Sequence, residues 1–385
     1  MRSRENDPLD TVSRVPAPSD ATKQTGPIAV YGATGFTGGL IARELRARGA
    51  DFVIAGRDRA KLEALAVELG GVPTAAAPVD DAAGLREMLE PCAAVVACAG
   101  PFTLHGEPVL AAAVKTGTHY LDTTGEQPFI RMVFDRYGAR AAERGAALVS
   151  GMGFDYAPGD MLAALTADGM GPLEEIVVAY AVHGFSPTHG TALSALEMMR
   201  GGDIVWRDGA WQPAPRSGDG GRWRFAEPIG EQRMLRYPAG EQITVPRHVE
   251  TRRVRTLLNG MVVPPRLMPL AVAATPLLGL AMRTPLRRAS GALIRRLPAA
   301  PSERARKASR FTLSSEARAI GGETRRGTVS GSDVYRLTAV SLAHGAQLCA
   351  DPSFDRSGAL APAQAFDPAS FLDALGVLTE IDECR

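Results

Sequence analysis

The chain has few cysteines and no excess of either sign of charge. Its 385 residues include only Cys92, Cys98, Cys349 and Cys384, which lack the spacing of metal ligands. We therefore expect reduced thiols, as is typical of a cytoplasmic protein, and no metal site. Lys and Arg number 43 and Asp and Glu number 42, so the net charge gives no indication of a nucleic-acid partner.

The sequence also lacks an uninterrupted apolar run long enough to span a membrane. The candidate segment, 267–282, contains Pro269 and Pro276 and is shorter than the about 20 residues that a spanning helix needs. An arginine-rich stretch with apolar residues between the charges extends it to residue 297. We expect 267–297 to be a buried or dimer-forming helix, an interfacial helix with peripheral membrane contact, or a lid over an apolar substrate. Residues 1–25 are polar, and we predict that they form a disordered leader.

Three glycines follow an apolar segment at 28–31 and form the most informative feature of the chain. Gly32, Gly35 and Gly38 have the spacing G-x-x-G-x-x-G, and a helical apolar pattern comes next. In a strand–turn–helix unit such glycines allow a tight bend and close approach of a pyrophosphate, which binds at the helix N-terminus. The pattern predicts a dinucleotide site; the alternative is a purely structural glycine turn.

The residue after the second predicted strand, 51–55, indicates which dinucleotide binds. An NAD site usually carries Asp or Glu about 20 residues past the glycines, whereas this chain has Arg57 there, followed by Lys61. Arginine can hold a phosphate with two N–H groups, so we predict NADPH as the cofactor. Asp58 is expected to cap the next helix, and Arg57 as a solvated surface residue remains the alternative.

Predicted strands and helices alternate from Gly26 to about residue 150. This alternation, with apolar strands, predicts an α/β fold: a Rossmann-type doubly wound parallel sheet covered by helices on both faces. The predicted strands are 27–31, 51–55, 75–79, 93–98, 118–121 and 146–150, and the predicted helices are 36–48, 58–69, 82–90, 106–116 and 128–144.

Two loops at the carboxyl ends of these strands are candidate cofactor contacts, because ligands bind at that edge of a parallel sheet. After the third strand, Asp80 and Asp81 either meet the adenine side of the cofactor or cap a helix. The fourth strand leads into the loop that we expect to touch the nicotinamide ribose, which comprises Ala99, Gly100, Pro101 and Phe102.

The pattern changes near residue 151, which indicates an inserted mixed α+β domain. We expect a strand-rich run at 175–182, a helix at 190–200, an Asp-Gly hairpin at 206–211 and a polar loop at 216–222. Further strands are predicted at 232–237, 250–257, 309–319 and 323–331, and closing helices at 334–350 and 368–375. The expected division is a leader (1–25), a Rossmann domain (26–150), a substrate and dimerisation domain (151–333) and C-terminal helices returning to the Rossmann domain (334–385).

Several motifs together resemble the saccharopine dehydrogenase-like oxidoreductases, and within them the branch called trans-acting enoyl reductases. They are the glycine turn at 32–38, Ala-Gly-Arg-Asp at 55–58, and Ala-Gly-Pro-Phe at 99–102, supported by 116–126 and 153–160. The resemblance implies a central domain whose sheet often mediates dimerisation, so we expect a homodimer. It also implies a phosphate loop made of Gly32, Thr34, Gly35, Phe36, Thr37 and Gly38. The arginine set that holds a diacid substrate in the amino-acid enzymes of this family has no match here.

No Ser-His-Asp order, Walker loop or metal cluster is present, so the cofactor is expected to carry the difficult chemistry. The protein must then supply a proton near the domain junction. The candidate proton donors are His105, Tyr120, Asp155 and Tyr156, and the candidate substrate contacts are Asp122, His183 and His189. Each also has a structural interpretation, such as a helix cap for Asp122 or a loop-stabilising bond for Asp155.

These observations predict an NADPH-dependent reductase that transfers hydride to a C=C bond of an unsaturated small-molecule or acyl-type substrate, carrier-bound or a secondary metabolite. Reduction of an imine or iminium is the alternative within the same enzyme class. A non-catalytic NADP-binding sensor is the alternative outside it.

Overall fold

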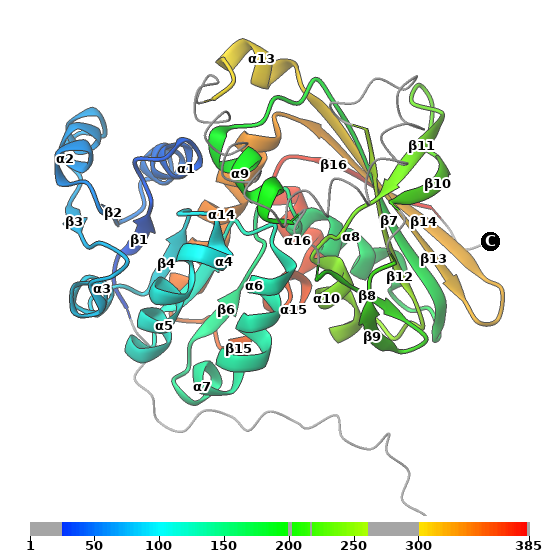
Figure 1. The fold of residues 1–385 in the computed structure, drawn as a ribbon, viewed down its shortest axis with the longest axis horizontal. Coiled ribbons are helices and arrows are strands. Elements are labelled where there is room, and N and C mark those ends of the chain that lie inside the picture. Colours follow the sequence, from blue (N-terminus) through cyan, green and yellow to red (C-terminus); the bar gives the residue numbers. More distant parts are fainter. Residues whose placement is uncertain (1–24, 199–201, 216–217, 261–299, 383–385) are drawn as a thin grey trace, which may run out of the picture.

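The computed structural model describes residues 25–198, 202–215, 218–260 and 300–382. Within them, two seven-stranded sheets and a small hairpin carry the fold, and the two large sheets lie side by side (Figure 1). The expected leader up to residue 24 and the 267–297 segment fall outside these ranges.

The first sheet is parallel, with the strand order β15-β6-β5-β4-β1-β2-β3. Because the order reverses between β1 and β4, loops on either side of that point diverge and leave a crevice at the carboxyl edge, which is where doubly wound sheets bind ligands. This confirms the Rossmann-type prediction. The strands are β1 (Ile28–Tyr31), β2 (Phe52–Gly56), β3 (Thr74–Ala76), β4 (Ala94–Ala97), β5 (His119–Asp122), β6 (Ala147–Val149) and β15 (Gly358–Ala359).

Helices cover both faces of this sheet. One face packs against α1 (Phe36–Ala47), α2 (Arg59–Glu68) and α14 (Val334–Ala350), and the other against α3 (Ala82–Leu89) and α5 (Glu107–Thr116). The short α4 (Phe102–His105) precedes α5. The single helix predicted at 128–144 is instead α6 (Gln127–Met132), a π-helical turn (Val133–Tyr137) and α7 (Gly138–Glu143).

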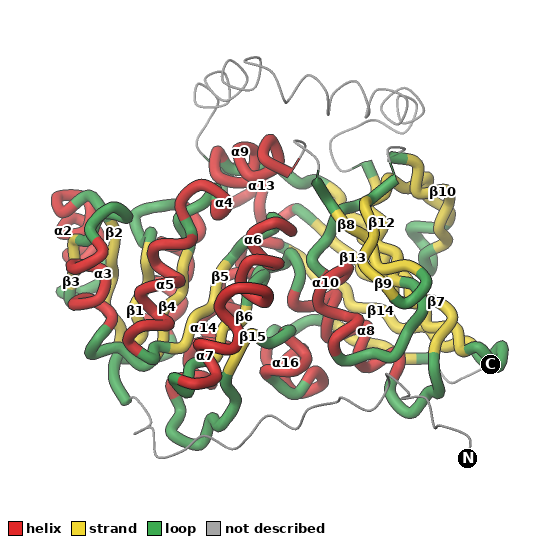
Figure 2. Tube along the Cα trace, turned by 60° about the horizontal axis from the view of Figure 1, so that its bottom comes forward, coloured by secondary structure: helices red, strands yellow, loops and turns green. Residues whose placement is uncertain are grey.

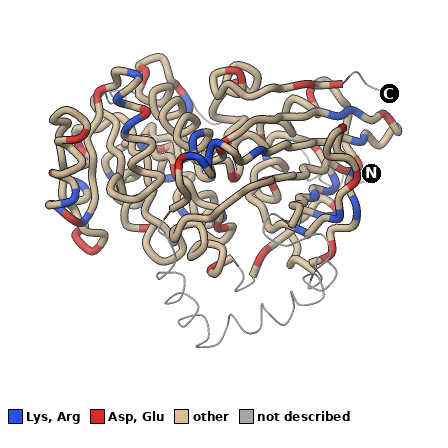
Figure 3. The backbone as a smooth tube through the Cα atoms, turned by 90° about the horizontal axis from the view of Figure 1, so that it is seen from above, with Lys and Arg blue, Asp and Glu red and all other residues tan. Residues whose placement is uncertain are grey.

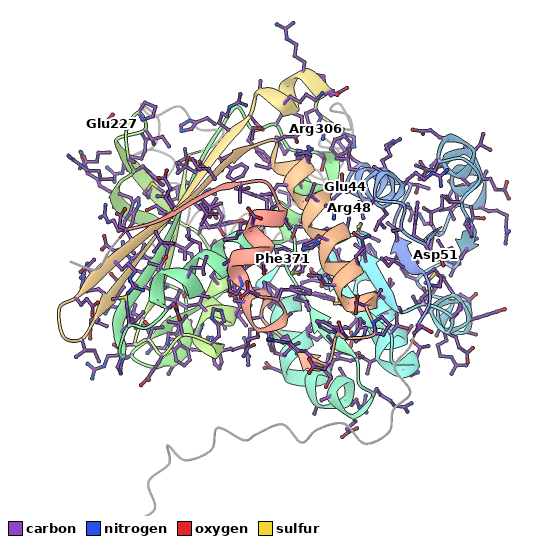
Figure 4. All side chains as sticks on the ribbon, turned by 180° about the vertical axis from the view of Figure 1, so that it is seen from behind. Glu44, Arg48, Asp51, Glu227, Arg306 and Phe371 are labelled. Atoms are coloured by element: carbon purple, nitrogen blue, oxygen red, sulfur yellow. The ribbon has the colours of Figure 1, made fainter. Side chains whose placement is uncertain are left out.

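Helix α14 returns from the second domain and closes the first one, as predicted for the C-terminal helices. It lies against α1, where the Arg48 guanidinium bonds the side-chain oxygen of Gln347 at 3.3 Å and also contacts Glu44 at 2.8 Å (Figure 4). Leu342 and Ala346 of α14 are fully buried. The Rossmann sheet therefore depends on a helix that the chain supplies only after residue 333.

The second sheet has the order β10-β11-β12-β7-β13-β14-β16 and is antiparallel except for the β12–β7 pair. Helix α8 (Ala157–Ala167) packs against β7, β13 and β14. The strands are β7 (Leu173–His183), β10 (Asp219–Arg224), β11 (Glu231–Arg236), β12 (Val254–Asn259), β13 (Arg310–Ala319), β14 (Thr324–Ser332) and β16 (Leu378–Ile381).

The Asp-Gly hairpin prediction is confirmed. Strands β8 (Ile204–Arg207) and β9 (Ala210–Pro213) pair around Asp208 and Gly209, whose φ angles are 56° and 73°. Both values are positive, as the two central residues of a type I′ turn require. The helix predicted at 190–200 is α9 (His189–Met198).

Three strands were not predicted. The loop prediction at 216–222 is wrong, because β10 begins at Asp219 and buries Trp223 in a cluster with Val177 and Met234. Strand β15 adds only two residues to the first sheet, and β16 lies at the edge of the second with Leu378 exposed. The remaining short elements are α10 (Glu241–Thr244), a 3-10 turn (Val245–Arg247), α13 (Glu303–Ala308), α15 (Pro362–Ala365) and α16 (Pro368–Ala374).

One hydrophobic core runs through both domains. A single cluster of buried side chains includes Val149 of the first sheet, Leu342 of α14, and Tyr180 and Phe311 of the second sheet. Lys and Arg positions are interspersed with Asp and Glu positions along the backbone (Figure 3). The shared core fixes where the second domain stands relative to the carboxyl edge of the first sheet.

Candidate functional site

The glycine turn between β1 and α1 has the geometry of a phosphate-binding loop. A Cβ at Gly38 would lie 2.3 Å from the carbonyl oxygen of Gly32, and one at Gly32, whose φ is 85°, would lie 3.1 Å from the backbone nitrogen of Ala99. Gly35 is the N-cap of α1, and no side chain caps that helix. Its first N–H groups are thus left for a ligand, and an anion there is stabilised by the helix dipole. The exposed Thr34 and the half-buried Phe36 and Thr37 line the same turn.

The loop after β2 gives different surroundings to Arg57 and Lys61, which were both predicted to bind the cofactor. Asp58 caps α2 by accepting the backbone N–H of Lys61 at 3.2 Å, and the Lys61 ammonium lies 3.1 Å from the same carboxylate. Arg57 is exposed and makes no hydrogen bond or ion pair within the described residues. Arg57 is therefore the group available for a 2′-phosphate, whereas Lys61 already has a partner.

Asp81, not Asp80, caps α3, since its carboxylate accepts the backbone N–H of Gly84 at 2.9 Å. Asp80 stays exposed at the same edge of the sheet as Arg57. Burial raises the pKa of Tyr31, at the end of β1, to about 12. The nearby positive charge of Arg57 opposes this rise, and the negative charge of Asp80 adds to it. Both charges thus lie near the end of β1, on the adenosine side of the predicted site.

The loop after β4 is held by the carboxylate of Glu126, which was not predicted to be a site residue. Ala99, Gly100 and Pro101 lead into α4, and Oε1 of Glu126 accepts the Phe102 backbone N–H at 2.8 Å. The ring of Phe102 is buried against Phe129 at 5.4 Å. His105 ends α4 and is exposed. Glu126 lies within the 116–126 motif, which was the available signal for it.

Asp122 joins the ends of two neighbouring strands. Its carboxylate is fully buried and accepts the backbone N–H groups of Thr124 and Gly151, both at 2.9 Å, and the Ser150 hydroxyl at 2.8 Å. Burial raises its pKa to about 6, and these hydrogen bonds oppose that rise. Tyr120, on the same face of β5, is fully buried beside it. Through these hydrogen bonds Asp122 links the end of β5 to the residues that follow β6.

Acids and tyrosines meet beyond the end of β6, where the chain leaves the first sheet. Asp155 is partly exposed, and its Oδ1 accepts the Tyr237 hydroxyl at 3.1 Å. The buried Tyr156 donates to the carbonyl of Gly125 at 2.6 Å. Burial raises the pKa of Asp155 to about 6, and the Tyr237 hydrogen bond opposes that rise. Among the candidate proton donors, Asp155 combines partial exposure, a raised pKa and a place at the domain junction.

Deeper in the same cluster, Tyr180 of β7 hydrogen-bonds Oε1 of Glu241, which is fully buried. The other oxygen, Oε2, has no hydrogen-bond partner in the described structure. Burial raises the pKa of Glu241 to about 8. The Tyr180 and Tyr237 rings lie 5.9 Å apart, so the two acid–tyrosine pairs are neighbours.

The loop between His183 and His189 reaches the phosphate loop through one tyrosine. The Tyr335 hydroxyl accepts the Thr188 backbone N–H at 2.9 Å, and its ring stands edge-on to Phe36 at 5.3 Å. His183 is exposed at the end of β7, and His189 begins α9. Tyr335 therefore brings the inserted domain to the start of α1.

Helix α9 continues from this loop across the carboxyl edge of the first sheet, next to α4 (Figure 2). A Cβ at Gly100 would lie 3.4 Å from the Ser194 hydroxyl oxygen, and one at Gly125 would lie 3.7 Å from the Met198 sulfur. No helix in the described ranges is long and apolar enough to cross a membrane, and no group of three or more His, Cys, Asp or Glu residues there is arranged to hold a metal ion.

A parallel doubly wound sheet, an uncapped glycine turn and an inserted domain over its carboxyl edge define a dinucleotide-binding protein of the Rossmann type. Residues 28–149 match the family model of the saccharopine dehydrogenase NADP binding domain. This segment is thus an NADP-binding domain of the saccharopine dehydrogenase type, which confirms both the predicted resemblance and the predicted cofactor.

Curated relatives carry the same two names that the motifs suggested. The chain is 39% identical over 140 residues to a trans-acting enoyl reductase of Mycobacterium ulcerans, covering 35% of this chain and 34% of that protein. It is 33% identical over 153 residues to a saccharopine dehydrogenase-like oxidoreductase of Bos taurus, covering 35% of each. The matches therefore span about a third of the length of these relatives.

The fold extends beyond the segment matched in sequence. The apo saccharopine dehydrogenase (L-Glu forming) of Saccharomyces cerevisiae superposes with a TM-score of 0.64 at 15% identity, covering 93% of this chain and 100% of that one. The inserted domain and the C-terminal elements thus share the architecture of that protein.

Proposed function

We propose that the chain is an NADPH-dependent reductase that reduces a C=C bond of an unsaturated acyl-type substrate. The observation that carries the proposal is the NADP-binding domain at 28–149, with Arg57 unpaired at the adenosine edge and an inserted domain over the nicotinamide side. Relatives at 36–39% identity named trans-acting enoyl reductases favour an enoyl substrate.

The residues divide into those that bind the cofactor and those that serve the acceptor. The N–H groups at the start of α1 would hold the pyrophosphate, Arg57 the 2′-phosphate, and the 99–102 loop the nicotinamide side. When bound, NADPH supplies a hydride to one carbon of the double bond. The chain must then deliver a proton to the other carbon, and Asp155 is the donor that we propose, because burial keeps part of it protonated near neutral pH.

Reduction of a C=N bond is the second candidate, and the fold shared with saccharopine dehydrogenase favours it. The same hydride and proton positions serve both reactions. We also propose that the protein is a homodimer, which light scattering would test, and that it is cytoplasmic, which cell fractionation would test. The alternatives given above for 267–297 belong to the same proposal, and the same two measurements bear on a dimer-forming or membrane-contacting segment.

The deciding experiment offers NADPH with two acceptors, a trans-2-enoyl thioester and an imine formed from a keto acid and an amine. We expect NADPH oxidation with the enoyl thioester and a saturated thioester in equal amount by mass spectrometry. Turnover of the imine alone would select the second candidate. Tight NADPH binding without turnover of any acceptor would instead favour a sensor.

A further inference from the structure

Glu126 is a buried carboxylate shared by the two domains. It is 1% exposed, yet it accepts hydrogen bonds from the Phe102 backbone N–H at 2.8 Å, the Thr103 backbone N–H at 2.9 Å and the Thr103 hydroxyl. The Ser194 hydroxyl of α9 donates a further bond at 3.0 Å. Both carboxylate oxygens are therefore fully used, and their donors come from α4 of the first domain and α9 of the second.

The bonds to Phe102 and Thr103 immobilise the loop on the nicotinamide side. They satisfy N–H groups in the first turn of α4, which has no side-chain cap at its own N-cap position, Pro101. Gly100 and Pro101 directly precede these residues, in the loop that follows β4, the strand next to β1. A charge-assisted bond at this point limits the positions that the 99–102 loop can adopt.

Ser194 adds the contribution of the inserted domain. Its hydroxyl bonds the same Oε1 that holds Phe102, and it stands within 3.4 Å of a Cβ placed on Gly100. Within the described residues, α9 has no fully buried side chain, so it covers the loop without being part of the hydrophobic core. Loss of this hydroxyl would leave the core packing unchanged.

We propose that Glu126 is a positioning residue that sets the nicotinamide-side loop, and that Ser194 links the seating of α9 to that loop through the same carboxylate. This rests on NADPH binding as proposed above but not on which acceptor is reduced. Glu126 does not touch the reacting atoms; it acts through the Phe102 and Thr103 backbone.

The test compares NADPH with adenosine 2′,5′-bisphosphate, which has the 2′-phosphate but no nicotinamide. Ser194→Ala should weaken NADPH about three- to tenfold and leave the bisphosphate unchanged by calorimetry. Glu126→Gln places an amide N–H₂ against the Thr103 N–H and should weaken NADPH about tenfold or more, with the same selectivity. Ala195→Ser, which adds a hydroxyl at the adjacent exposed position, is the control and should change neither affinity.

Equal losses for both ligands would overturn the positioning role and assign Glu126 to general support of the fold. Unchanged NADPH affinity in Ser194→Ala would overturn the link to α9. If Glu126→Gln fails to fold, as circular dichroism would show, Ser194→Ala decides the question alone because it leaves no buried charge unpaired. In that case a loss of affinity for NADPH but not for the bisphosphate supports the proposal, and equal losses or no loss overturn it. Absence of turnover with every acceptor would count against the proposed function and would not change these binding results.

Discussion

The hydroxyl of Tyr237, which follows β11 of the second sheet, donates a 3.1 Å hydrogen bond to Oδ1 of Asp155, which follows β6 of the first sheet. The proposed proton donor thus follows a strand of the first sheet and is oriented by a residue that follows a strand of the second. Correct placement of the acid requires both domains to be in their native arrangement.

Asp155→Asn should lower kcat about 10²- to 10⁴-fold, because proton delivery depends on this carboxyl. Burial raises its pKa to about 6, so its protonated fraction falls as the pH rises through that value. Turnover limited by proton transfer should therefore decrease above about pH 6, and the variant should lose this decrease. Tyr237→Phe removes a bond that favours the carboxylate, so its profile should shift to higher pH. An unchanged profile in Asp155→Asn would exclude Asp155 as the donor.

Arg57→Ala should weaken NADPH about ten- to hundredfold and leave NADH almost unaffected, because only NADPH carries the 2′-phosphate. Titration of both cofactors measures the difference. Lys61→Ala is the matched control: its ammonium is paired with Asp58, so we expect a smaller change. Equal loss of NADPH and NADH in Arg57→Ala would refute the assignment.

Gly35→Val should abolish cofactor binding while the fold is retained. A Cβ at Gly35 would lie 3.2 Å from the Gly32 carbonyl oxygen, and the two added methyl groups would occupy the exposed N-terminus of α1 where the pyrophosphate should approach. Calorimetry with NADPH is the measurement, with the thermal midpoint as the check on folding. Gly171→Ala, a site with open space around its Cβ, is the control; normal binding in Gly35→Val would assign the turn another role.

Glu241→Gln should flatten the pH dependence of stability. Burial raises the pKa of Glu241 from the ordinary value of 4.5 to about 8, so the folded protein holds this proton more tightly than the unfolded chain does. The resulting stabilisation is complete below about pH 4.5 and is lost as the pH rises through about 8. The thermal unfolding midpoint of the native protein should therefore decrease as the pH is raised from about 6 to about 9. In the variant this decrease should be smaller by about 2 °C. Glutamine still accepts from Tyr180. An exposed control, Glu380→Gln, should leave the slope unchanged, and a slope unchanged in Glu241→Gln as well would contradict the assignment.

Features with local signals were predictable from the sequence. The Gly32 turn, the Asp58 cap and the Asp208 hairpin each follow from the backbone needs of a few consecutive residues. The two strands of the hairpin could be placed for the same reason. The alternation of strands and helices likewise predicted the Rossmann sheet.

The contacts that complete the site have no local signal. Tyr335 bonds Thr188 across 147 residues of sequence, and Tyr237 bonds Asp155 across 82. Glu126 is an ordinary carboxylate in the sequence and gains its significance only when α4 and α9 converge on it. Strand β15 is too short to show a periodicity; it pairs with β6 at a place where a Cβ on Gly138 would lie 3.2 Å from the Cβ of Ala359.

The late position of α14 in the chain has a consequence for biosynthesis. When the segment up to residue 149 leaves the ribosome, its sheet lacks the helix that covers Leu121 and Val149, and translation of the about 200 residues still needed takes about 10 to 40 s. During that interval an apolar face of the nascent domain is open to chaperones and to other chains. Completion of the NADP-binding half therefore has to wait until α14 has been synthesised.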